Sequence, residues 1–404
     1  MGSVSTDILV IGDGIVGSTA AYELALAGHS VTVIGDGGGA SASEGNAGIL
    51  AISYAKPMST PESVINGIRS LAGLGHEVEF GRPLSPRTLS WFVRFTIASR
   101  PGRAIRSASG IHRMALRSLA LYDRLSEREE LDLMLRHTGW LYAARTKTAL
   151  EVQRQAAESL TSLGIGHDVL SPSELRQAEP GLGPGHVGGV FYHDDVAMDP
   201  THLTAQVRTA CVRHGVDFHH DRVVSADQER SGRVRAVTTQ GGKEHRARHI
   251  VLAAGAQSRE VGALFRSTLP VEPAFGWNAL FRAETALASR LLMSIEDHVI
   301  INAAQDSVRV TGGMEFGGTH STQPQQEQIV ALRESAQKLL PALRELGEPV
   351  STWRGARPMT PSGEPIVRHL APNLSAATGH GTLGMTLAPA TAEQVSALVS
   401  EILR

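Results

Sequence analysis

The chain of 404 residues has a single cysteine, few lysines and no long apolar run. Each of these features excludes particular kinds of site or classes of protein. Its single cysteine, Cys211, excludes an internal disulfide and a metal site built from cysteine ligands. Cys211 falls in a helical run, which favours a buried structural thiol over a nucleophile. Arginine supplies almost all of the positive charge. The formal net charge of −2 implies no general attraction to nucleic acid or to an anionic membrane.

The lack of long apolar runs bears on location. No stretch has the length and apolarity of a transmembrane helix. The first eleven residues lack the basic segment of a secretory signal, and their apolar run is typical of a strand. We therefore expect a cytoplasmic protein, with contact at the periphery of the inner membrane left open. The length and the hydrophobic fraction of 42% predict two domains with real cores.

The most informative stretch lies at the start of the chain. An apolar, β-branched run at residues 5–11 predicts a buried strand. The glycines of GDGIVG follow it at once, at residues 12–17. Residues 19–26 then continue as a helix and residues 30–34 as a second strand. Between a strand and a helix, this motif predicts a dinucleotide site.

Each glycine of the motif has its own task there. Gly12 permits the tight turn, Gly14 lets the backbone approach a pyrophosphate, and Gly17 lets the helix pack against the strand. Ile15 and Val16 begin the helix, whose N-terminus offers N–H groups and the positive end of its dipole. The competing interpretation is a glycine-rich turn that binds nothing.

The carboxylate that usually binds a ribose hydroxyl is displaced in this sequence. Dinucleotide folds carry it at the end of the second strand, where this chain has Gly35 and then Asp36. Either Asp36 reaches the ribose from one residue further out, or backbone and water take its place. In a third interpretation, Asp36 is a turn residue ahead of the glycines that follow it.

A loop of small residues follows at residues 37–48, and such a loop lets backbone lie against a flat ligand. Asn46 either offers its amide to a heterocycle or a substrate, or forms an Asx turn. Further along the chain, Asp194, Asp195 and Asp199 look like a metal cluster. Turn and helix-cap roles are favoured instead, because no histidine-plus-carboxylate spacing accompanies them. We therefore expect no metal.

The rest of the chain predicts a second domain and then a return to the first. Residues 62–137 are mainly helical, and residues 269–312 alternate in the manner of antiparallel strands. A strand at 373–378 then leads through a glycine-rich loop at 379–386 into a C-terminal helix at 386–403. A glycine-rich loop that feeds a helix N-terminus is again a site for negative charge.

The two ends of the chain together resemble the D-amino acid oxidase superfamily of FAD enzymes, and in particular its D-amino acid dehydrogenase branch. The residues that carry the resemblance are GDGIVG (12–17), Asn46-Ala47-Gly48, GARPMTPSGEP (355–365) and GHGTLGMTLAP (379–389), with weaker matches at Tyr54-Ala55-Lys56-Pro57 and Thr138-Gly139-Trp140. The C-terminal pair is the specific part, because the first motif alone does not separate FAD from NAD. The resemblance spans nearly the full chain.

The resemblance implies an α/β fold in two parts. A discontinuous, Rossmann-like FAD-binding domain is assembled from residues 1–56, 198–258 and 351–404. An α+β substrate domain, built on an antiparallel sheet, takes residues 57–197 and 259–350.

It also implies how FAD is held without a covalent bond. The N-terminal glycines bind the pyrophosphate, Val223 contacts the adenine through its backbone, and Ala254 and Gly255 close the nucleotide pocket. The flavin is lined by Ser43, Asn46, Ala47 and Gly48, and by the N–H groups of Gly381, Thr382, Leu383, Gly384, Met385 and Thr386. Reduction puts negative charge on the pyrimidine edge of the flavin, and a helix N-terminus stabilises that charge.

For the reaction, the resemblance implies an amino acid dehydrogenase or oxidase that acts on CH–NH2 or CH–NH donors. Arg357 matches the arginine that pairs with the substrate carboxylate, and Tyr54, Trp277 and His380 shape or polarise the pocket. A hydride passes from the amine-bearing carbon of a D-amino acid or N-substituted amino acid to flavin N5, and the imine hydrolyses to an oxo acid. The competing interpretation of Arg357 is a structural salt bridge, and that of His380 is a brace for its loop.

Other activities fit the same scaffold. A 2-hydroxy acid and a secondary amine of the sarcosine or glycine type are the alternative substrates, and the electron acceptor is oxygen, a quinone or a protein. A flavin-binding protein without catalysis and a nicotinamide-dependent dehydrogenase are further alternatives. The family's Lys-Gly-Tyr-Ser segment stands here as Phe275-Gly276-Trp277-Asn278, and Met58 replaces a frequent tryptophan. We therefore expect a pocket wall that differs from the family's common form.

Overall fold

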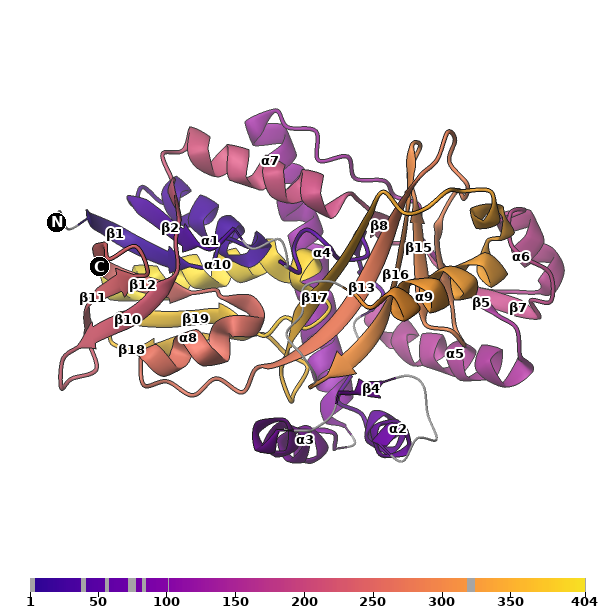
Figure 1. Cartoon of the computed structure of the whole chain (residues 1–404), viewed down its shortest axis with the longest axis horizontal. Helices are drawn as coiled ribbons and strands as arrows, with labels where there is room; N and C mark the ends of the chain where they lie inside the picture. The colour runs from indigo at the N-terminus through magenta and orange to yellow at the C-terminus, as the bar shows by residue number, and fades with distance from the viewer. Residues whose placement is uncertain are drawn as a thin grey trace.

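Two sheets dominate the computed structural model, which describes residues 4–37, 41–54, 58–71, 78–81, 85–100, 102–317 and 324–403 (Figure 1). Residues 38–40 of the small-residue loop lie outside the described residues. The same holds for Ala55, Lys56 and Pro57 of the weaker family match.

The first sheet holds both ends of the chain. Within the described residues its eight strands are β1 (Val4–Ile11), β2 (Val31–Gly35), β9 (Asp217–His220), β10 (Val223–Gln228), β11 (Val234–Thr239), β12 (Glu244–Leu252), β18 (Ile366–Ala371) and β19 (Leu374–Thr378). Its centre is parallel: β1 pairs with β2 and β12, β2 with β9, and β12 with β19. The hairpin β10–β11 and the strand β18 are antiparallel additions.

The centre of this sheet explains the first predicted strand. Ile8, Leu9 and Val10 of β1 are fully buried, so side chains on both faces of the strand are covered. A strand covered on both faces reads as a continuous apolar run and not as an alternating one. The predicted strand is confirmed, and it places the glycines of residues 12–17 at the carboxyl edge of the parallel strands.

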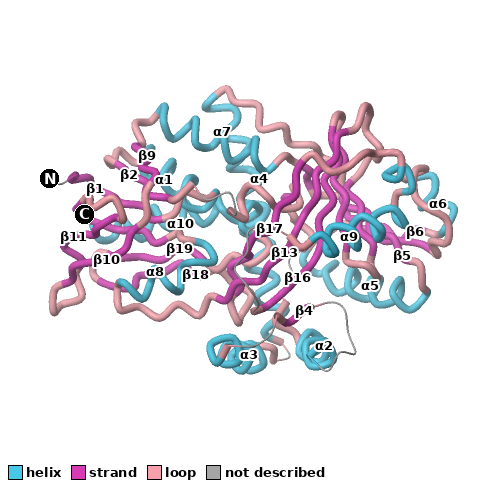
Figure 2. The backbone as a smooth tube through the Cα atoms, in the orientation of Figure 1, coloured by secondary structure: helices cyan, strands magenta, loops and turns pink. Residues whose placement is uncertain are grey.

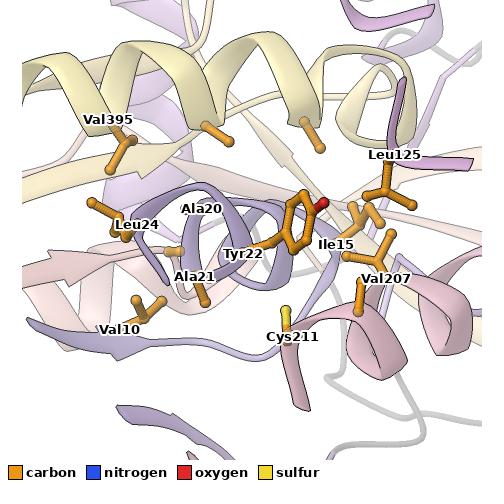
Figure 3. Packing of buried hydrophobic residues seen from close by; sticks show 14 of the residues in the cluster. Val10, Ile15, Ala20, Ala21, Tyr22, Leu24, Leu125, Val207, Cys211 and Val395 are labelled. Atoms are coloured by element: carbon orange, nitrogen blue, oxygen red, sulfur yellow. The ribbon is translucent and has the colours of Figure 1, made fainter. Parts of the chain in front are cut away.

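Helices from distant parts of the chain pack together on this sheet. α1 (Ile15–Leu26) lies along α10 (Gly384–Leu403), with α4 (Arg103–Glu129) and α7 (Pro200–Arg213) beside them (Figure 1). The close-up in Figure 3 shows Ala20, Tyr22 and Leu24 of α1 in this packing. The two helices that follow the glycine loops are therefore neighbours.

The lone cysteine belongs to the same core (Figure 3). Cys211 of α7 is fully buried, and its thiol donates to the carbonyl of Ser18 at 3.2 Å. Burial raises the pKa of this thiol to about 12, which suppresses the reactive thiolate. Cys211 is a structural thiol, as the sequence predicts.

The second sheet is mainly antiparallel. Within the described residues its nine strands are β4 (Glu79–Phe80), β5 (Trp140–Ala144), β6 (His167–Leu170), β7 (Gly188–Tyr192), β13 (Glu272–Arg282), β14 (Leu291–Ser294), β15 (Val299–Ala303), β16 (Ser307–Phe316) and β17 (Ser351–Met359). Only the β5–β14 and β4–β16 pairs are parallel among them. The predicted combination of a Rossmann-like sheet with an antiparallel sheet is confirmed.

Smaller elements complete the fold. β3 (Ile49–Leu50) and β8 (Val196–Ala197) form a two-stranded ribbon. Four further helices are α5 (Lys147–Leu160), α6 (Pro172–Ala178), α8 (Ser258–Leu264) and α9 (Gln326–Leu339), with short 3-10 turns at Thr161–Leu163, Gly255–Gln257 and Pro341–Arg344. Figure 2 shows α9 lying across the second sheet and α8 beside the first.

α2 (Pro61–Leu71) and α3 (Pro86–Ala98) form a helical layer at one edge of the molecule (Figure 2). Trp91 and Phe95 of α3 are buried in one cluster with Phe316 of β16, so this face of α3 belongs to the core. Across the ranges that the structure describes, every helix is too short or too polar to cross a membrane.

The domain boundaries stay a prediction. The boundary at residues 56 and 57 falls outside the described residues, and two elements connect the parts at the others. β17 lies in the sequence segment assigned to the FAD-binding domain, yet it pairs with β13 in the second sheet. α4 lies in the segment assigned to the substrate domain, yet Tyr122 donates to the Met385 carbonyl of α10 at 2.8 Å.

Candidate active site

A cavity of about 980 Å³ opens where the carboxyl edge of the first sheet meets β13 and β17. Both glycine loops border it, through Gly12, Gly14, Ile15 and Val16 on one side and Gly381, Thr382, Gly384 and Met385 on the other. Other predicted site residues on its wall are Asp36, Ser43, Asn46, Val223, Ala254, Gly255, Arg357 and His380. The structure thus brings most of the residues singled out in the sequence around one space.

Two glycines show why the first turn cannot carry side chains. Gly12 has φ +114°, and a Cβ there would overlap the carbonyl of Ala253, just beyond β12. A Cβ on Gly17 would overlap the carbonyl of Gly12. Gly17 therefore lies behind the loop and lets α1 start against the strand end, which matches the packing task that the sequence assigns to it.

Two side chains of the next loop stabilise local structure. Oγ of Ser43 accepts the N–H of Ile15 at 2.9 Å, which commits one amide of the α1 N-terminus. Asn46 accepts the N–H of Gly48 through Oδ1 at 2.8 Å, and its Nδ2 donates to the carbonyl of Ala42 at 3.0 Å. The Asx-turn interpretation therefore describes the contacts of Asn46 within the described residues, although Ser43 and Asn46 also border the cavity.

Two asparagines of the second sheet fix this loop, and sequence analysis missed both. Nδ2 of Asn302 on β15 donates to the carbonyls of Gly48 at 2.8 Å and Ala47 at 3.2 Å. Nδ2 of Asn278 on β13 donates to the carbonyl of Gly45. Ala47 and Gly48, expected at the flavin, are held from behind and do not line the cavity. A buried asparagine in a strand carries no sequence pattern that reveals such a contact.

The C-terminal loop is also supported from outside the cavity. Oγ1 of Thr386 accepts the N–H of Ala51 at 2.9 Å, so this side chain ties α10 to the chain after the first loop. Leu383 lines a smaller neighbouring cavity. Leu383 and Thr386 are therefore the two members of the expected loop contacts that the large cavity does not include.

His380 borders both cavities and is held in place by a neighbour. It is 3% exposed, and its Nε2 lies 2.9 Å from Oγ1 of Thr391 in α10. Burial lowers the pKa of its imidazole to about 4, so the ring is neutral at neutral pH. These contacts fit the interpretation of His380 as a brace for its loop.

Arg357 of β17 presents a cation to the large cavity. Its Nη1 donates to the carbonyl of Gly313 at 2.8 Å, and Gly276 on β13 leaves room for the guanidinium, which a Cβ there would overlap. Within the described residues it forms no ion pair. Burial lowers the pKa of Arg357 to about 10, so it stays charged at neutral pH. A charged fork on a cavity wall is suited to bind a carboxylate.

The neighbouring Arg354 differs because its charge is already matched. Its Nη2 lies 2.8 Å from Oε2 of Glu315, and its guanidinium lies 4.0 Å from the centre of the Phe275 ring. Arg354 is only 4% exposed. Of the two arginines on this strand, Arg357 is the one with capacity for an anionic ligand.

Tyr54 lines the smaller cavity, of about 90 Å³, which shares His380, Gly381 and Thr382 with the large one. Burial raises the pKa of Tyr54, and the charge of Arg357 acts in the opposite direction, which places the two side chains near each other. Within the described residues the lining of this cavity has no charged side chain and is largely apolar, with Met58, Val78, Phe80, Trp91, Phe92, Phe95, Phe316 and Met359.

Trp277 does not reach either cavity, contrary to expectation. It is buried in the core of the second sheet, and its ring lies against Gly313. Strand alternation predicts that Phe275 and Trp277 share a face. An irregularity in the pairing of β13 with β16 falls between these two residues, and only Phe275 borders the cavity.

The acidic residues that look like a metal cluster have separate structural roles. Oδ1 of Asp199 accepts the N–H of His202 at 2.7 Å and caps α7, as predicted. Asp195 is fully buried and accepts from the N–H and the hydroxyl of Ser53, at 2.9 and 2.5 Å. Over the ranges that the structure describes, no group of three or more His, Cys, Asp or Glu residues could hold a metal ion.

The cavity fits a dinucleotide in shape and chemistry. Its N-terminal side is lined by the backbone of Gly12 and Gly14, and Gly12 has no room for a side chain because a Cβ there would overlap the carbonyl of Ala253. The starts of α1 and α10 border it, and helix N-termini favour anionic groups. Its lining includes Gly35, Asp36 and Val223 as well as Arg357 and His380, and its volume leaves room for a ligand larger than an amino acid.

The chain is similar in sequence to known proteins, and its fold is similar to solved structures. A family model described as FAD dependent oxidoreductase matches residues 7–398. A D-amino acid dehydrogenase of Dechloromonas aromatica (strain RCB) is 31% identical over 408 residues, covering 97% of this chain and 96% of that protein. Glycine oxidase from Geobacillus kaustophilus has a TM-score of 0.78 at 22% identity, covering 99% of this chain and 95% of that one. Iminodiacetate oxidase from Chelativorans sp. BNC1 has 0.76 at 18%, covering 98% and 95%.

Proposed function

The chain belongs to the family of FAD-dependent oxidoreductases, and from this premise we propose that it oxidises an amino acid at the carbon that bears the amine. The observation that carries the proposal is Arg357, a guanidinium on the cavity wall that no described carboxylate neutralises. The relatives named D-amino acid dehydrogenase support an amino acid as the substrate, and a D-amino acid in particular.

FAD is the cofactor, and when bound it supplies the two-electron acceptor for a hydride from the substrate. The glycine loops at Gly12–Gly14 and Gly381–Gly384 would hold it from two sides. We propose that it is held without a covalent bond, because Cys211 is buried in the helical core and away from the cavity lining.

The chain's own part in the reaction is to bind and orient. Arg357 would pair with the substrate carboxylate through its fork, and this anchors the carbon that is oxidised. His380 is neutral and bonded to Thr391, so we assign it a positioning role and no proton. The substrate would bind with a neutral amine, and the imine product would hydrolyse to an oxo acid.

The lining of the smaller cavity supports a proposal for the substrate class. It adjoins the large cavity at His380, Gly381 and Thr382, and no charged side chain of the described residues lines it. Aromatic and methionine side chains in such a wall favour apolar groups over polar ones. We propose that it receives the apolar side chain, or an apolar N-substituent, of the amino acid whose carboxylate is held by Arg357.

An anaerobic screen tests this function. The purified holoenzyme is mixed with D- and L-amino acids, N-substituted amino acids and 2-hydroxy acids, and bleaching of the flavin absorption is followed. We expect reduction by amino acids with apolar side chains and a weak response to acidic ones. Arg357→Ala should raise KM at least tenfold with flavin still bound. Reduction by 2-hydroxy acids alone, or an unchanged KM in Arg357→Ala, would overturn the proposal.

The layer of α2 and α3 supports contact with a membrane surface. Three apolar side chains on each helix are 41–61% exposed: Ile65, Ile68, Leu71, Leu89, Val93 and Ile97. Exposed arginines lie on these two helices at 69, 87 and 94, and three more follow α3 in the sequence, at 100, 103 and 106. Apolar groups beside basic ones match an anionic lipid surface. We propose that this layer rests on the membrane periphery, where a quinone could accept electrons.

A further inference from the structure

The carboxylate of Asp13 occupies the space that a side chain at position 35 would fill. Gly35 is the last residue of β2, and a Cβ placed on it would overlap the Cγ and Oδ1 atoms of Asp13. Dinucleotide-binding folds place the carboxylate that binds the ribose at the end of this second strand. Asp13 therefore supplies a carboxylate at the very place where the strand's own is missing.

The surroundings of Asp13 leave one of its oxygens available. Oδ2 lies 3.1 Å from Nη2 of Arg208, which also donates to the backbone carbonyl of Asp13 at 2.8 Å. Oδ1 has no hydrogen-bond partner among the described residues. Asp13 borders the large cavity together with Gly35 and Asp36. The charge of Arg208 also offsets a carboxylate that stands in a phosphate-binding loop, where negative charge would otherwise repel a pyrophosphate.

We propose that Asp13, and not Asp36, binds a ribose hydroxyl in the adenosine half of FAD. In this arrangement position 35 is glycine because the Asp13 carboxylate needs its space, so the two positions have exchanged roles. Asp36 lies one residue beyond the strand, on exposed backbone. The inference rests on the cofactor of the family and is independent of the substrate.

FAD binding to the apoprotein tests the exchange directly, through the quenching of flavin fluorescence. The probes are FAD and an FAD analogue whose adenosine lacks the 2′-hydroxyl. We expect the unmodified protein to bind the analogue about 10-fold more weakly than FAD. Asp13→Ala should weaken FAD binding by about 10- to 100-fold, because a charged hydrogen bond is lost. The dissociation constants of this variant for FAD and for the analogue should then differ by less than about threefold.

The double variant is the sharper measurement. Gly35→Asp alone should lose FAD binding because its side chain overlaps Asp13. Asp13→Ala with Gly35→Asp should regain both the affinity and the discrimination between the probes, because it restores the carboxylate at the strand end. Thermal unfolding of each apoprotein shows whether the variant is folded. Recovery of FAD affinity in the double variant can be read even if one of the single variants fails to fold.

Arg208→Gln and Asp36→Asn are the matched controls. If Asp13 only anchors Arg208, Arg208→Gln weakens FAD as much as Asp13→Ala does and the unmodified protein binds both probes equally. If Asp36 is the ribose ligand, Asp36→Asn removes the discrimination and Asp13→Ala keeps it. Either result overturns the proposal.

Discussion

The guanidinium of Arg357 lies against the α-carbon of Gly276, on the neighbouring strand β13. The would-be Cβ of Gly276 falls 2.6 Å from Cζ of Arg357, which is too close for any side chain. Gly276 pairs with Gly355 on β17, so two glycines face each other where the arginine passes. The position of the cation is therefore set by the absence of a side chain on the next strand.

Gly276→Ala should displace Arg357 without removing its charge. We expect KM for the amino acid to rise about 10- to 100-fold, the range for loss of hydrogen bonds to a charged group, with FAD still bound. Steady-state kinetics and the flavin spectrum measure both. Gly312→Ala is the matched control, because it adds the same methyl group on β16 against Leu332 and not against the arginine. A normal KM in Gly276→Ala would show that the site tolerates movement of Arg357.

Carboxylate binding should weaken at high pH. Burial lowers the pKa of Arg357 to about 10, so the cation is intact at pH 7–9 and is lost as the pH rises through 10. Propionate has no amine that titrates there. We expect its dissociation constant, followed by the flavin spectrum, to be flat up to pH 9 and to rise toward tenfold per pH unit above 10. Circular dichroism establishes that the protein is still folded. A flat profile up to pH 11 would contradict the assignment.

His380 should contribute no inflection to the pH profile of kcat between pH 5 and 9. Burial lowers its pKa to about 4, so the ring is neutral and does not titrate between pH 5 and 9. His380→Gln should lower kcat by less than about tenfold, as expected for a lost positioning hydrogen bond, and should keep the shape of the kcat profile. Loss of an inflection in that range would instead show that His380 carries a proton in turnover.

Asp195 should make the protein less stable as the pH rises. Burial raises its pKa from 3.8 to about 6, despite the hydrogen bonds from Ser53. The folded state therefore binds a proton that the unfolded state releases, and this stability is present below pH 4 and lost as the pH rises through 6. Over that window the stability of Asp195→Asn relative to the unmodified protein should increase by roughly 1–3 kcal/mol. Denaturant unfolding of the holoenzyme at several pH values measures it.

The exposed neighbour Asp194 provides the control for that experiment. Asp194→Asn changes the same charge at the surface and should leave the slope of stability against pH within a few tenths of a kcal/mol of the original. Equal slopes in the Asp195→Asn variant and the unmodified protein would mean that the buried carboxyl group is already ionised near pH 4.

The layer of α2 and α3 should bind anionic vesicles. We expect co-sedimentation with vesicles of phosphatidylethanolamine and phosphatidylglycerol, weaker at high salt, and little with phosphatidylcholine alone. Ile68→Asp with Val93→Asp should reduce binding at least tenfold and leave soluble-acceptor activity intact. Val212→Asp, at an apolar residue that is 62% exposed on α7, should have no effect. Equal binding by both variants would exclude this surface.

Local patterns predicted the first sheet and the two glycine loops well, because strand, turn and helix signals lie within a few residues of each other. Residues 12–17 thus predict a dinucleotide site, and residues 379–386 predict a second site for negative charge. Their convergence on one cavity depends on the packing of α1 against α10, which the sequence implied only through the family resemblance.

The roles of side chains on the second sheet cannot be predicted from local sequence patterns, for a physical reason. Asn278 and Asn302 matter through contacts with residues more than 200 positions away in the chain, which no local pattern records. The family motif predicts Trp277 in the pocket, whereas the side chain lies in the core of the second sheet, next to an irregularity in strand pairing. The exchange between Asp13 and Gly35 leaves no local pattern, because it depends on the space between a loop residue and a strand end that are distant in the sequence.

Asn302 also bears on how the enzyme can move. Its amide is bonded at once to the loop of the first sheet, at Gly48, and to Met198 ahead of α7 at 3.1 Å. Moving the two sheets apart would break these hydrogen bonds, at a net cost of about 0.5–1.5 kcal/mol for each bond. The Asn302 bonds therefore oppose a hinge motion between the two sheets and favour a fixed geometry of the large cavity.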